Sequence, residues 1–195
     1  HAATAEKIFH LPHGEVSPDL RRRAKTINFG IIYGMSAFGL AKDLNCSTEE
    51  AQAYISAYFA THPEVKAYMD ENVRKAKENG FVTTILGRKR FIPELKSGNY
   101  NQRTFGERAA MNMPLQGSAA DIIKIAMLRV AERLKREKMA SQLVLQVHDE
   151  LILDTPEEET EAAIKVLKEE MEGALALKVP LIAEVSTGKS WYDAK

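Results

Sequence analysis

Helix start signals occur repeatedly in the first half of the chain and constrain its fold more than any other feature. Ser17-Pro18-Asp19 supplies an N-cap, a proline suited to the first helical position and an acid at the positive helix end. A helix is therefore expected over residues 18–33, ending near Gly34. Ser47-Thr48-Glu49-Glu50 has the capping-box pattern and predicts another helix, after a short one over residues 37–44. The front of the chain is thus expected to be almost entirely helical.

Strand-like segments enter only later in the chain, between further helices. The remaining expected elements are a helix from Pro63 to Gly80, a hairpin of 81–86 and 90–92 turning at Gly87-Arg88, a helix over 101–113 stopped by Pro114, a helix over 118–138, strands over 143–147 and 151–154, a helix over 157–172 and a strand over 181–185. A helical front followed by mixed strands and helices predicts an α+β fold, in which a mostly helical subdomain precedes a short antiparallel sheet with packed helices.

Composition narrows the class of protein. Hydrophobic residues make up 45 % of 195 residues, which is typical of a globular chain, and no apolar run is long enough to span a bilayer. The single cysteine, Cys46, excludes an internal disulfide framework and favours a reducing, cytoplasmic setting. No secretory signal opens the chain, and its start at His1 without Met suggests a piece of a longer protein.

Charge is balanced overall but unevenly placed along the chain. The formal net charge is zero, with basic runs at 21–25 and 88–90 and acidic runs at 157–159 and 169–170. A zero net charge argues against a uniformly basic nucleic-acid binder. It remains compatible with a local basic patch that faces nucleic acid.

Four side chains recur at every fourth position of the first long helix: Arg21, Lys25, Phe29 and Tyr33. Four residues advance a helix about 40° past a full turn, so these side chains form one slowly winding stripe. The stripe is cationic at its start and aromatic further on, which matches the phosphates and the flat base of a nucleoside triphosphate. From spacing alone, the alternative is a solvated cationic helix end with two core aromatics.

The residues of this helix also carry a family resemblance. R-R-R-A-K-T-I-N-F-G-I-I-Y-G, residues 21–34, resembles the fingers-helix motif R-x-x-x-K-x-x-x-F/Y-G-x-x-Y-G of bacterial polymerase I-type (family A) DNA polymerases at every defined position. The resemblance implies that Arg21 and Lys25 hold the triphosphate and that Lys25 acts in catalysis by offsetting phosphate charge. Phe29 would stack beside the incoming sugar and base. Tyr33 would occupy the template position when the site is open.

Two further expectations follow from the same resemblance. His1 lies twenty residues before Arg21, the spacing of a family histidine that contacts the triphosphate, so His1 joins the expected dNTP-binding residues. Family members with Phe at the Phe29 position discriminate against dideoxynucleotides, and the same behaviour is expected here.

Adjacent carboxylates, Asp149 and Glu150, lie between two apolar strands. Acids held together repel each other unless a cation neutralises them, and Mg²⁺ prefers such hard oxygen ligands. The alternative is an ordinary polar hairpin turn, in which Asp is common. V-H-D-E-L, residues 147–151, is similar to the palm motif of the same family. The resemblance implies that Asp149 is a catalytic metal ligand, that Glu150 is a neighbouring carboxylate of lesser weight, and that His148 approaches the primer end.

A third segment lies between these two. Residues 107–121, E-R-A-A-M-N-M-P-L-Q-G-S-A-A-D, resemble the family segment that contacts duplex DNA. The residues expected to bind DNA are Arg108, Asn112, Gln116 and Gln146 together with His148. Minor-groove acceptors are nearly the same for every base pair, so such contacts test pairing geometry rather than sequence. Without the resemblance, Arg108 and Asn112 would be read as the polar side of an amphipathic helix.

The resemblance implies the fingers subdomain over residues 1–116 and the C-terminal part of the palm over 117–195. The expected reaction is template-directed DNA synthesis from dNTP onto a primer 3′-hydroxyl, in replication and repair, in the cytoplasm at the nucleoid. Two Mg²⁺ ions would be shared with an Asp of the motif D-Y-S-Q-I-E-L-R, which this chain lacks. The expected partners are primer-template DNA, dNTP and the N-terminal portion of the polymerase with the thumb and first half of the palm. The chain alone is therefore expected to be inactive.

Two other functions stay open at this level. A single-subunit RNA polymerase uses a similar fingers helix, although Phe29 and V-H-D-E-L together favour a DNA polymerase. A non-catalytic nucleic-acid-binding module would show template-primer affinity without activity.

Overall fold

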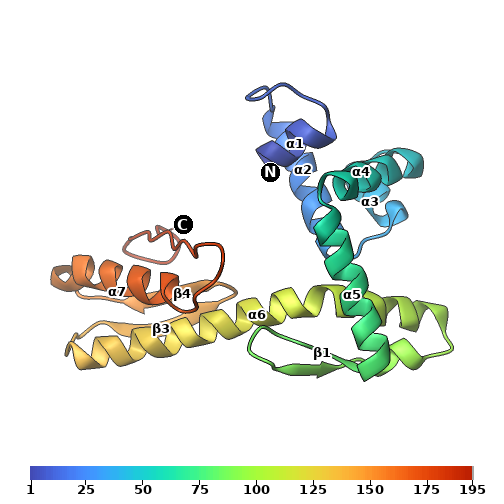
Figure 1. The fold of residues 1–195 in the computed structure, drawn as a ribbon. Coiled ribbons are helices and arrows are strands. Elements are labelled where there is room, and N and C mark those ends of the chain that lie inside the picture. Colours follow the sequence, from blue (N-terminus) through green and yellow to red (C-terminus); the bar gives the residue numbers. More distant parts are fainter. Residues whose placement is uncertain (195) are drawn as a thin grey trace. The chain divides into compact units, whose positions relative to one another are not determined.

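The computed structural model describes residues 1–194, which fold into helices and two small antiparallel sheets (Figure 1). The helices are α1 (Ala2–Ile8), α2 (Pro18–Ile32), α3 (Ala37–Leu44), α4 (Thr48–Thr61), α5 (Pro63–Asn79), α6 (Tyr100–Arg136) and α7 (Thr160–Glu172). The strands are β1 (Phe81–Thr83), β2 (Lys89–Phe91), β3 (Gln142–Val147) and β4 (Glu150–Asp154), and short 3-10 turns η1 (Pro93–Lys96) and η2 (Glu157–Glu159) precede α6 and α7. The predicted α+β class is confirmed.

The chain divides into two compact units, the first ending at Leu115 and the second starting at Gln116. The assignment of these units to fingers and palm stays a prediction. None of the described helices is long and apolar enough to cross a membrane.

Serine caps begin three helices of the first unit, α2, α3 and α4, close to the predicted helix starts. The hydroxyl oxygen of Ser17 accepts a hydrogen bond from the Leu20 N–H of α2 at 3.3 Å. Ser36 caps α3 in the same way at 3.2 Å, and Ser47 caps α4 at 3.1 Å. Each cap satisfies a backbone donor that the helix itself leaves unpaired. In the predicted capping box, the Glu50 carboxylate would accept from the backbone N–H of Ser47. It accepts instead from the Tyr54 hydroxyl at 2.7 Å, so the reciprocal half of the box is not formed.

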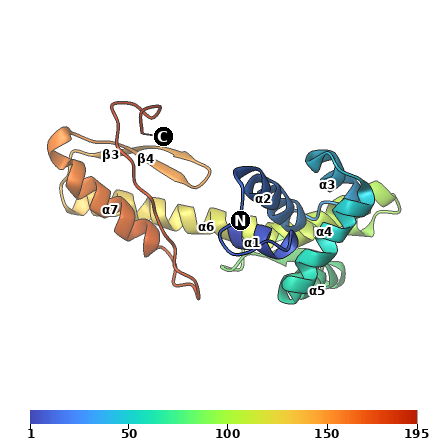
Figure 2. The ribbon, with the colours of Figure 1, turned by 90° about the horizontal axis from the view of Figure 1, so that it is seen from above.

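The core of the first unit forms where α1 to α5 meet. Its largest contributors are Ile27 and Ile31 of α2, Leu40 of α3, Tyr58 of α4 and Met69 of α5. The helices α1 and α2 lie side by side in both views (Figure 2). Because the buried residues of α2 share one side of the helix, its opposite side faces outward.

The β1–β2 hairpin has its own small core. Phe81 pairs with Phe91, Val82 with Arg90 and Thr83 with Lys89. Val82 is buried with Ala76, Ile92, Leu95 and Ala110. The strands are shorter than predicted because the turn begins early, with the N–H of Gly87 donating to the carbonyl of Thr84 at 2.9 Å.

Helix α6 corrects a prediction. The expected break at Pro114 is wrong, because one helix runs from Tyr100 to Arg136. Proline lacks an N–H and crowds the preceding turn, at a typical cost of about 3 kcal/mol. Here the ring is buried, and apolar residues of α6 on both sides of it pack into cores. That packing holds the helical geometry through the proline.

The second unit packs α7 and the β3–β4 hairpin against the C-terminal part of α6. Its buried residues are Ile123, Ala126, Val130 and Leu134 of α6, Leu151 of β4, Val166 of α7 and Ala174 after it. The strand predicted over 181–185 is absent, since these described residues pair with no strand. The N–H of Ala183 donates instead to the Glu172 carboxylate at 3.1 Å, so a side chain satisfies a group that a sheet would otherwise pair. The helix predicted from 157 begins as η2 and becomes α-helical at Thr160.

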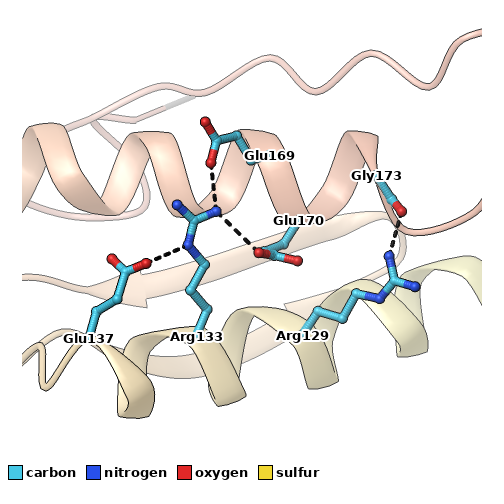
Figure 3. A network of polar contacts seen from close by, with 6 residues as sticks. All are labelled: Arg129, Arg133, Glu137, Glu169, Glu170 and Gly173. Atoms are coloured by element: carbon cyan, nitrogen blue, oxygen red, sulfur yellow. Dashed lines mark hydrogen bonds and ion pairs between the residues drawn. The ribbon is translucent and has the colours of Figure 1, made fainter.

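An arginine network joins α6 to α7 (Figure 3). The Arg133 guanidinium contacts Glu137 on its own helix at 2.7 Å and Glu169 and Glu170 of α7 at 2.6 and 3.1 Å. Its side chain is only 14 % exposed, and the hydrogen bonds that the guanidinium donates to Glu137, Glu169 and Glu170 raise its pKa. The Arg129 guanidinium donates to the Gly173 carbonyl just beyond α7. These contacts fix the end of α7 beside α6.

Candidate functional site

The outward side of α2 carries the predicted stripe. The buried residues of this helix are Ala24, Ile27, Gly30 and Ile31. Arg21 and Lys25 are exposed on the other side, and the rings of Phe29 and Tyr33 are 42 % and 41 % exposed. The alternative of two core aromatics is therefore wrong. The helix presents two cations and two aromatic faces to solvent.

The cationic and aromatic parts of the stripe lie next to each other. The Phe29 and Tyr33 rings are nearly parallel, with centroids 6.1 Å apart and planes inclined by 25°. The Lys25 ammonium lies 5.9 Å from the Phe29 ring centroid. An aromatic face next to a mobile cation suits a base and the phosphates attached to it.

Three consecutive arginines have three different surroundings. Arg22 is paired with Asp19 one turn earlier. Arg23 lies against the rings of Phe9 and Tyr54, 5.9 and 6.0 Å from their centroids. Arg21 is exposed and makes no ion pair within residues 1–194. Of the three guanidiniums, Arg21 is the one left available for a phosphate.

His1 lies beside the aromatic part of the stripe. Its ring centroid is 5.8 Å from that of Phe29. The Asn28 side-chain amide nitrogen is 2.8 Å from His1 Nδ1 and donates to the Thr4 hydroxyl at 3.1 Å. Asn28 was not predictable from the sequence, because nothing in its local pattern shows a contact with a residue 27 positions away.

The end of α2 packs closely on α6 through a glycine. Gly34 has φ +67°, and a Cβ built there would lie 3.0 Å from Arg108 Cγ and 3.1 Å from Met111 Sδ. Arg108 therefore lies next to the turn that follows Tyr33. One turn along α6, Asn112 Oδ1 is buried with no hydrogen-bond partner among the described residues. Gln116, expected to bind DNA, is exposed at the start of the second unit.

The second unit holds the acidic pair on the β3–β4 hairpin. Val147 pairs with Glu150, so His148 and Asp149 form the turn and Glu150 belongs to β4. His148 has φ +53°, and its carbonyl accepts a hydrogen bond from the Gln146 amide at 2.6 Å. That bond stabilises the turn that presents the carboxylates.

Both carboxylates face solvent without a counter-charge. Asp149 and Glu150 are exposed, and no hydrogen bond or ion pair reaches their side chains within the described part of the chain. Two adjacent carboxylates are suitable oxygen ligands for Mg²⁺. Among residues 1–194, no group of three or more His, Cys, Asp or Glu side chains could hold a metal ion.

Comparison with known proteins identifies the family. The family model described as DNA polymerase family A matches residues 1–193. The chain belongs to this family. Such polymerases generally use divalent metal ions, which fits the exposed carboxylate pair.

Curated relatives of the family A chain are bacterial DNA polymerases. It is 48 % identical over 195 residues to DNA polymerase I of Caldicellulosiruptor bescii and 51 % identical to those of Geobacillus stearothermophilus and Bacillus subtilis. All of this chain is covered, but only 23 % of the first relative and 22 % of the other two. These matches decide against a single-subunit RNA polymerase relative.

A solved structure agrees with this family A assignment. It is the POL domain of Pol1 from M. smegmatis in complex with DNA primer-template and dNTP, 44 % identical to this chain with a TM-score of 0.96. The match covers 100 % of this chain and 34 % of that one.

Proposed function

We propose that this chain is the fingers and the C-terminal part of the palm of a bacterial DNA polymerase I. The whole enzyme extends a primer along a template in DNA replication and repair, in the cytoplasm at the nucleoid. The observation that carries the proposal is the outward stripe of α2, cationic and then aromatic, on a family A chain.

The stripe binds the incoming dNTP. Arg21 and Lys25 grip the phosphates, with Arg21 able to form two parallel hydrogen bonds. His1 adds a third contact to the triphosphate. Phe29 stacks on the sugar and base, and Tyr33 holds the template position until a correct nucleotide arrives. Closure of α2 onto a paired nucleotide then selects the correct nucleotide by induced fit.

Asp149 and Glu150 would hold Mg²⁺ together with an Asp from a part of the polymerase outside this chain. Two bound Mg²⁺ ions would lower the pKa of the attacking hydroxyl and neutralise charge on the phosphates. The primer 3′-hydroxyl gives its proton to water, its oxygen bonds to the α-phosphorus, and the bond from that phosphorus to pyrophosphate breaks. Lys25 and Arg21 offset the negative charge that the leaving pyrophosphate carries.

The remaining predicted residues bind the primer-template duplex. Arg108, Asn112 and Gln116 lie four residues apart on α6, and the unpaired buried oxygen of Asn112 suits a donor from DNA or water. Gln146 at the end of β3 and His148 in the turn precede Asp149, near the proposed position of the primer end. Contacts to minor-groove acceptors there sense correct pairing without reading sequence.

Primer extension by the full-length enzyme tests the proposal. Asp149→Ala should abolish extension while leaving primer-template affinity nearly intact. Arg21→Ala should raise KM for dNTP by about ten- to a hundredfold, the value of one hydrogen bond to a charged group. Arg22→Ala is the matched control, because Arg22 is already paired with Asp19. An unchanged rate in Asp149→Ala would refute the metal assignment.

We expect the purified 195-residue chain to show no extension, because the proposed metal site also uses the Asp of the motif D-Y-S-Q-I-E-L-R, which is not in this sequence. Robust extension by the chain without a partner would contradict this. Template-primer binding without extension in the full-length protein would favour the second candidate, a non-catalytic nucleic-acid-binding module.

A further inference from the structure

A cavity of about 240 Å³ lies beside the end of α2, and all of its walls belong to the first unit. The side chains of Lys66 and Asp70 line it and are 53 % and 61 % exposed, so the cavity opens to solvent. Water, which occupies about 30 Å³ in the liquid, and molecules little larger than water have room to enter. The other side chains that line the cavity are apolar, and three of them are the methionines Met35, Met69 and Met111.

Two of these methionine sulfurs lie against glycines near the end of α2. A Cβ built at Gly30 would lie 3.3 Å from Met35 Sδ, and one built at Gly34 would lie 3.1 Å from Met111 Sδ. Both distances are shorter than the roughly 3.5–4.0 Å at which even two carbon atoms pack. Each glycine directly follows an aromatic residue of the stripe, so each sulfur lies beside backbone that positions one of its rings.

The same two methionines are more accessible than the third. Met69 is 7 % exposed and belongs to the core of the first unit, whereas Met35 and Met111 are half-buried and pack at the edge of that core. An oxidant that reaches a methionine sulfur converts a flexible apolar side chain into a polar sulfoxide. A small peroxide that enters the cavity therefore meets two reactive sulfurs in its walls.

We propose that Met35 and Met111 form an oxidation site through which hydrogen peroxide weakens nucleotide binding. The sulfur attacks one peroxide oxygen, so that an S–O bond forms while the O–O bond breaks. The sulfur loses two electrons, and the second oxygen leaves as hydroxide and takes up the proton of the transferred oxygen to give water. The product is methionine sulfoxide, which carries one additional polar atom.

The new oxygen atom has no favourable place in the folded first unit. Directed at the glycine, it meets backbone that already leaves too little room for a Cβ. Directed into the cavity, it meets apolar side chains, among which a polar group without a hydrogen-bond partner costs free energy. The Lys66 ammonium at the opening is already paired with Asp70 at 2.6 Å. The end of α2 must therefore move, and the two aromatic rings of the stripe move with it.

Peroxide treatment of the full-length enzyme tests the inference at two levels. Peptide mass spectrometry should locate the added oxygen on Met35 and Met111 before Met69. The KM for dNTP should then rise about fivefold or more, the smallest typical value of one stacked base, with a smaller change in kcat. The change in KM rests on the proposed function of the stripe, whereas the order of oxidation does not.

Enzymatic repair separates oxidised methionine from other damage. The two methionine sulfoxide reductases, one for each sulfoxide epimer, remove the added oxygen from methionine. They do not restore an oxidised cysteine, such as the half-buried Cys46. After repair, the KM for dNTP should return to its value in the untreated enzyme.

Replacement of the two sulfurs provides a matched test. The double variant Met35→Leu with Met111→Leu keeps the apolar volume and removes both thioethers, so its KM for dNTP should not change under peroxide. Met113→Leu is the control, because Met113 lies on the same helix as Met111 but packs in the core of the β1–β2 hairpin. This control should respond to peroxide as the unsubstituted enzyme does.

Three results would overturn the inference. The first is that Met35 and Met111 gain no oxygen before Met69, and the second is that both are oxidised without a rise in KM. The third is that KM rises equally in the double variant or stays raised after the sulfoxides have been repaired. The proposed polymerase function fails by a different result, the absence of primer extension by the untreated enzyme.

Discussion

Asn28 holds the imidazole ring of His1 in position and selects its tautomer. Its amide donates to His1 Nδ1 and to Thr4. When Nδ1 accepts, the proton of a neutral imidazole lies on Nε2, which leaves Nε2–H as a donor for a phosphate oxygen. Asn28 is therefore a positioning residue for the proposed triphosphate contact.

Removing this amide should be measurable in the full-length enzyme. Asn28→Ala should raise KM for dNTP about two- to tenfold, the value of one hydrogen bond, with a smaller effect on kcat. The nitrogen NMR shifts of His1 should also show a mixture of tautomers. Thr4→Val is the control, because it leaves the 2.8 Å contact between Asn28 and His1 in place. An unchanged tautomer in Asn28→Ala would show that Asn28 does not position the ring.

Gly34 is constrained twice, by its backbone and by its neighbours. Gly34→Ala should destabilise the chain by more than about 1–2 kcal/mol, the cost of a left-handed conformation for a residue with a Cβ, because the new methyl also meets Arg108 and Met111. Gly14→Ala provides the comparison, since Gly14 has φ +86° with nothing within 4 Å of the place that its new methyl group would take. Denaturant unfolding of both variants measures the difference. If both variants lost the same free energy of unfolding, the close approach of Gly34 to α6 would add nothing to the cost of Gly34→Ala.

At the scale of elements, the start of β3 is held by one carboxylate. Glu159 accepts from the N–H groups of Ala140 and Ser141 at 2.9 Å and from the Ser141 hydroxyl at 2.6 Å. The hydrogen bond from the Ser141 hydroxyl, followed by those from the two backbone groups, lowers the pKa of Glu159 below its usual value. This links η2 to the strand that leads to the acidic turn.

Stability should therefore depend on pH through Glu159. A depressed pKa in the folded state stabilises the fold above the unfolded-state pKa, and this stabilisation is lost as pH falls through the folded-state pKa. Glu159→Gln should lower Tm at neutral pH, and its Tm should converge with that of the unsubstituted chain below the folded-state pKa. Glu158 is an exposed neighbour, so Glu158→Gln should change neither the Tm at neutral pH nor the dependence of Tm on pH. If Glu159→Gln lowered Tm by the same amount at every pH, the stabilisation would not come from the ionised Glu159 carboxylate.

Elements were predictable where their signals are local. The starts of α2 and α4 followed from serine caps, and the β3–β4 hairpin followed from two apolar runs around His148 and Asp149. The continuity of α6 was not predictable, because packing on both sides of Pro114 overrides a local break signal. The contact of Asn28 with His1 was hidden for the same reason, since it joins residues far apart in the sequence.

At the scale of the whole molecule, the second unit leaves an apolar sheet face uncovered by the described residues. Leu145 pairs with Ile152 on the face opposite Leu151, which is buried against α6 and α7. Leu145 is 45 % exposed, and the neighbouring Val144 lies at an irregularity in the β3 register and is also exposed. Apolar surface of this kind, close to the proposed metal ligands, favours association with another surface.

The purified chain should therefore self-associate in a concentration-dependent way, as light scattering would show. Leu145→Lys should shift it toward monomer without unfolding, because the substituted side chain already faces solvent and the core around Leu151 is untouched. Lys168→Glu, an exchange of charge on α7, is the control for nonspecific electrostatic effects and should leave association unchanged. A clean monomer at all concentrations would mean that the exposed face is too small to drive association. Association that Leu145→Lys leaves intact would place the contact on another surface.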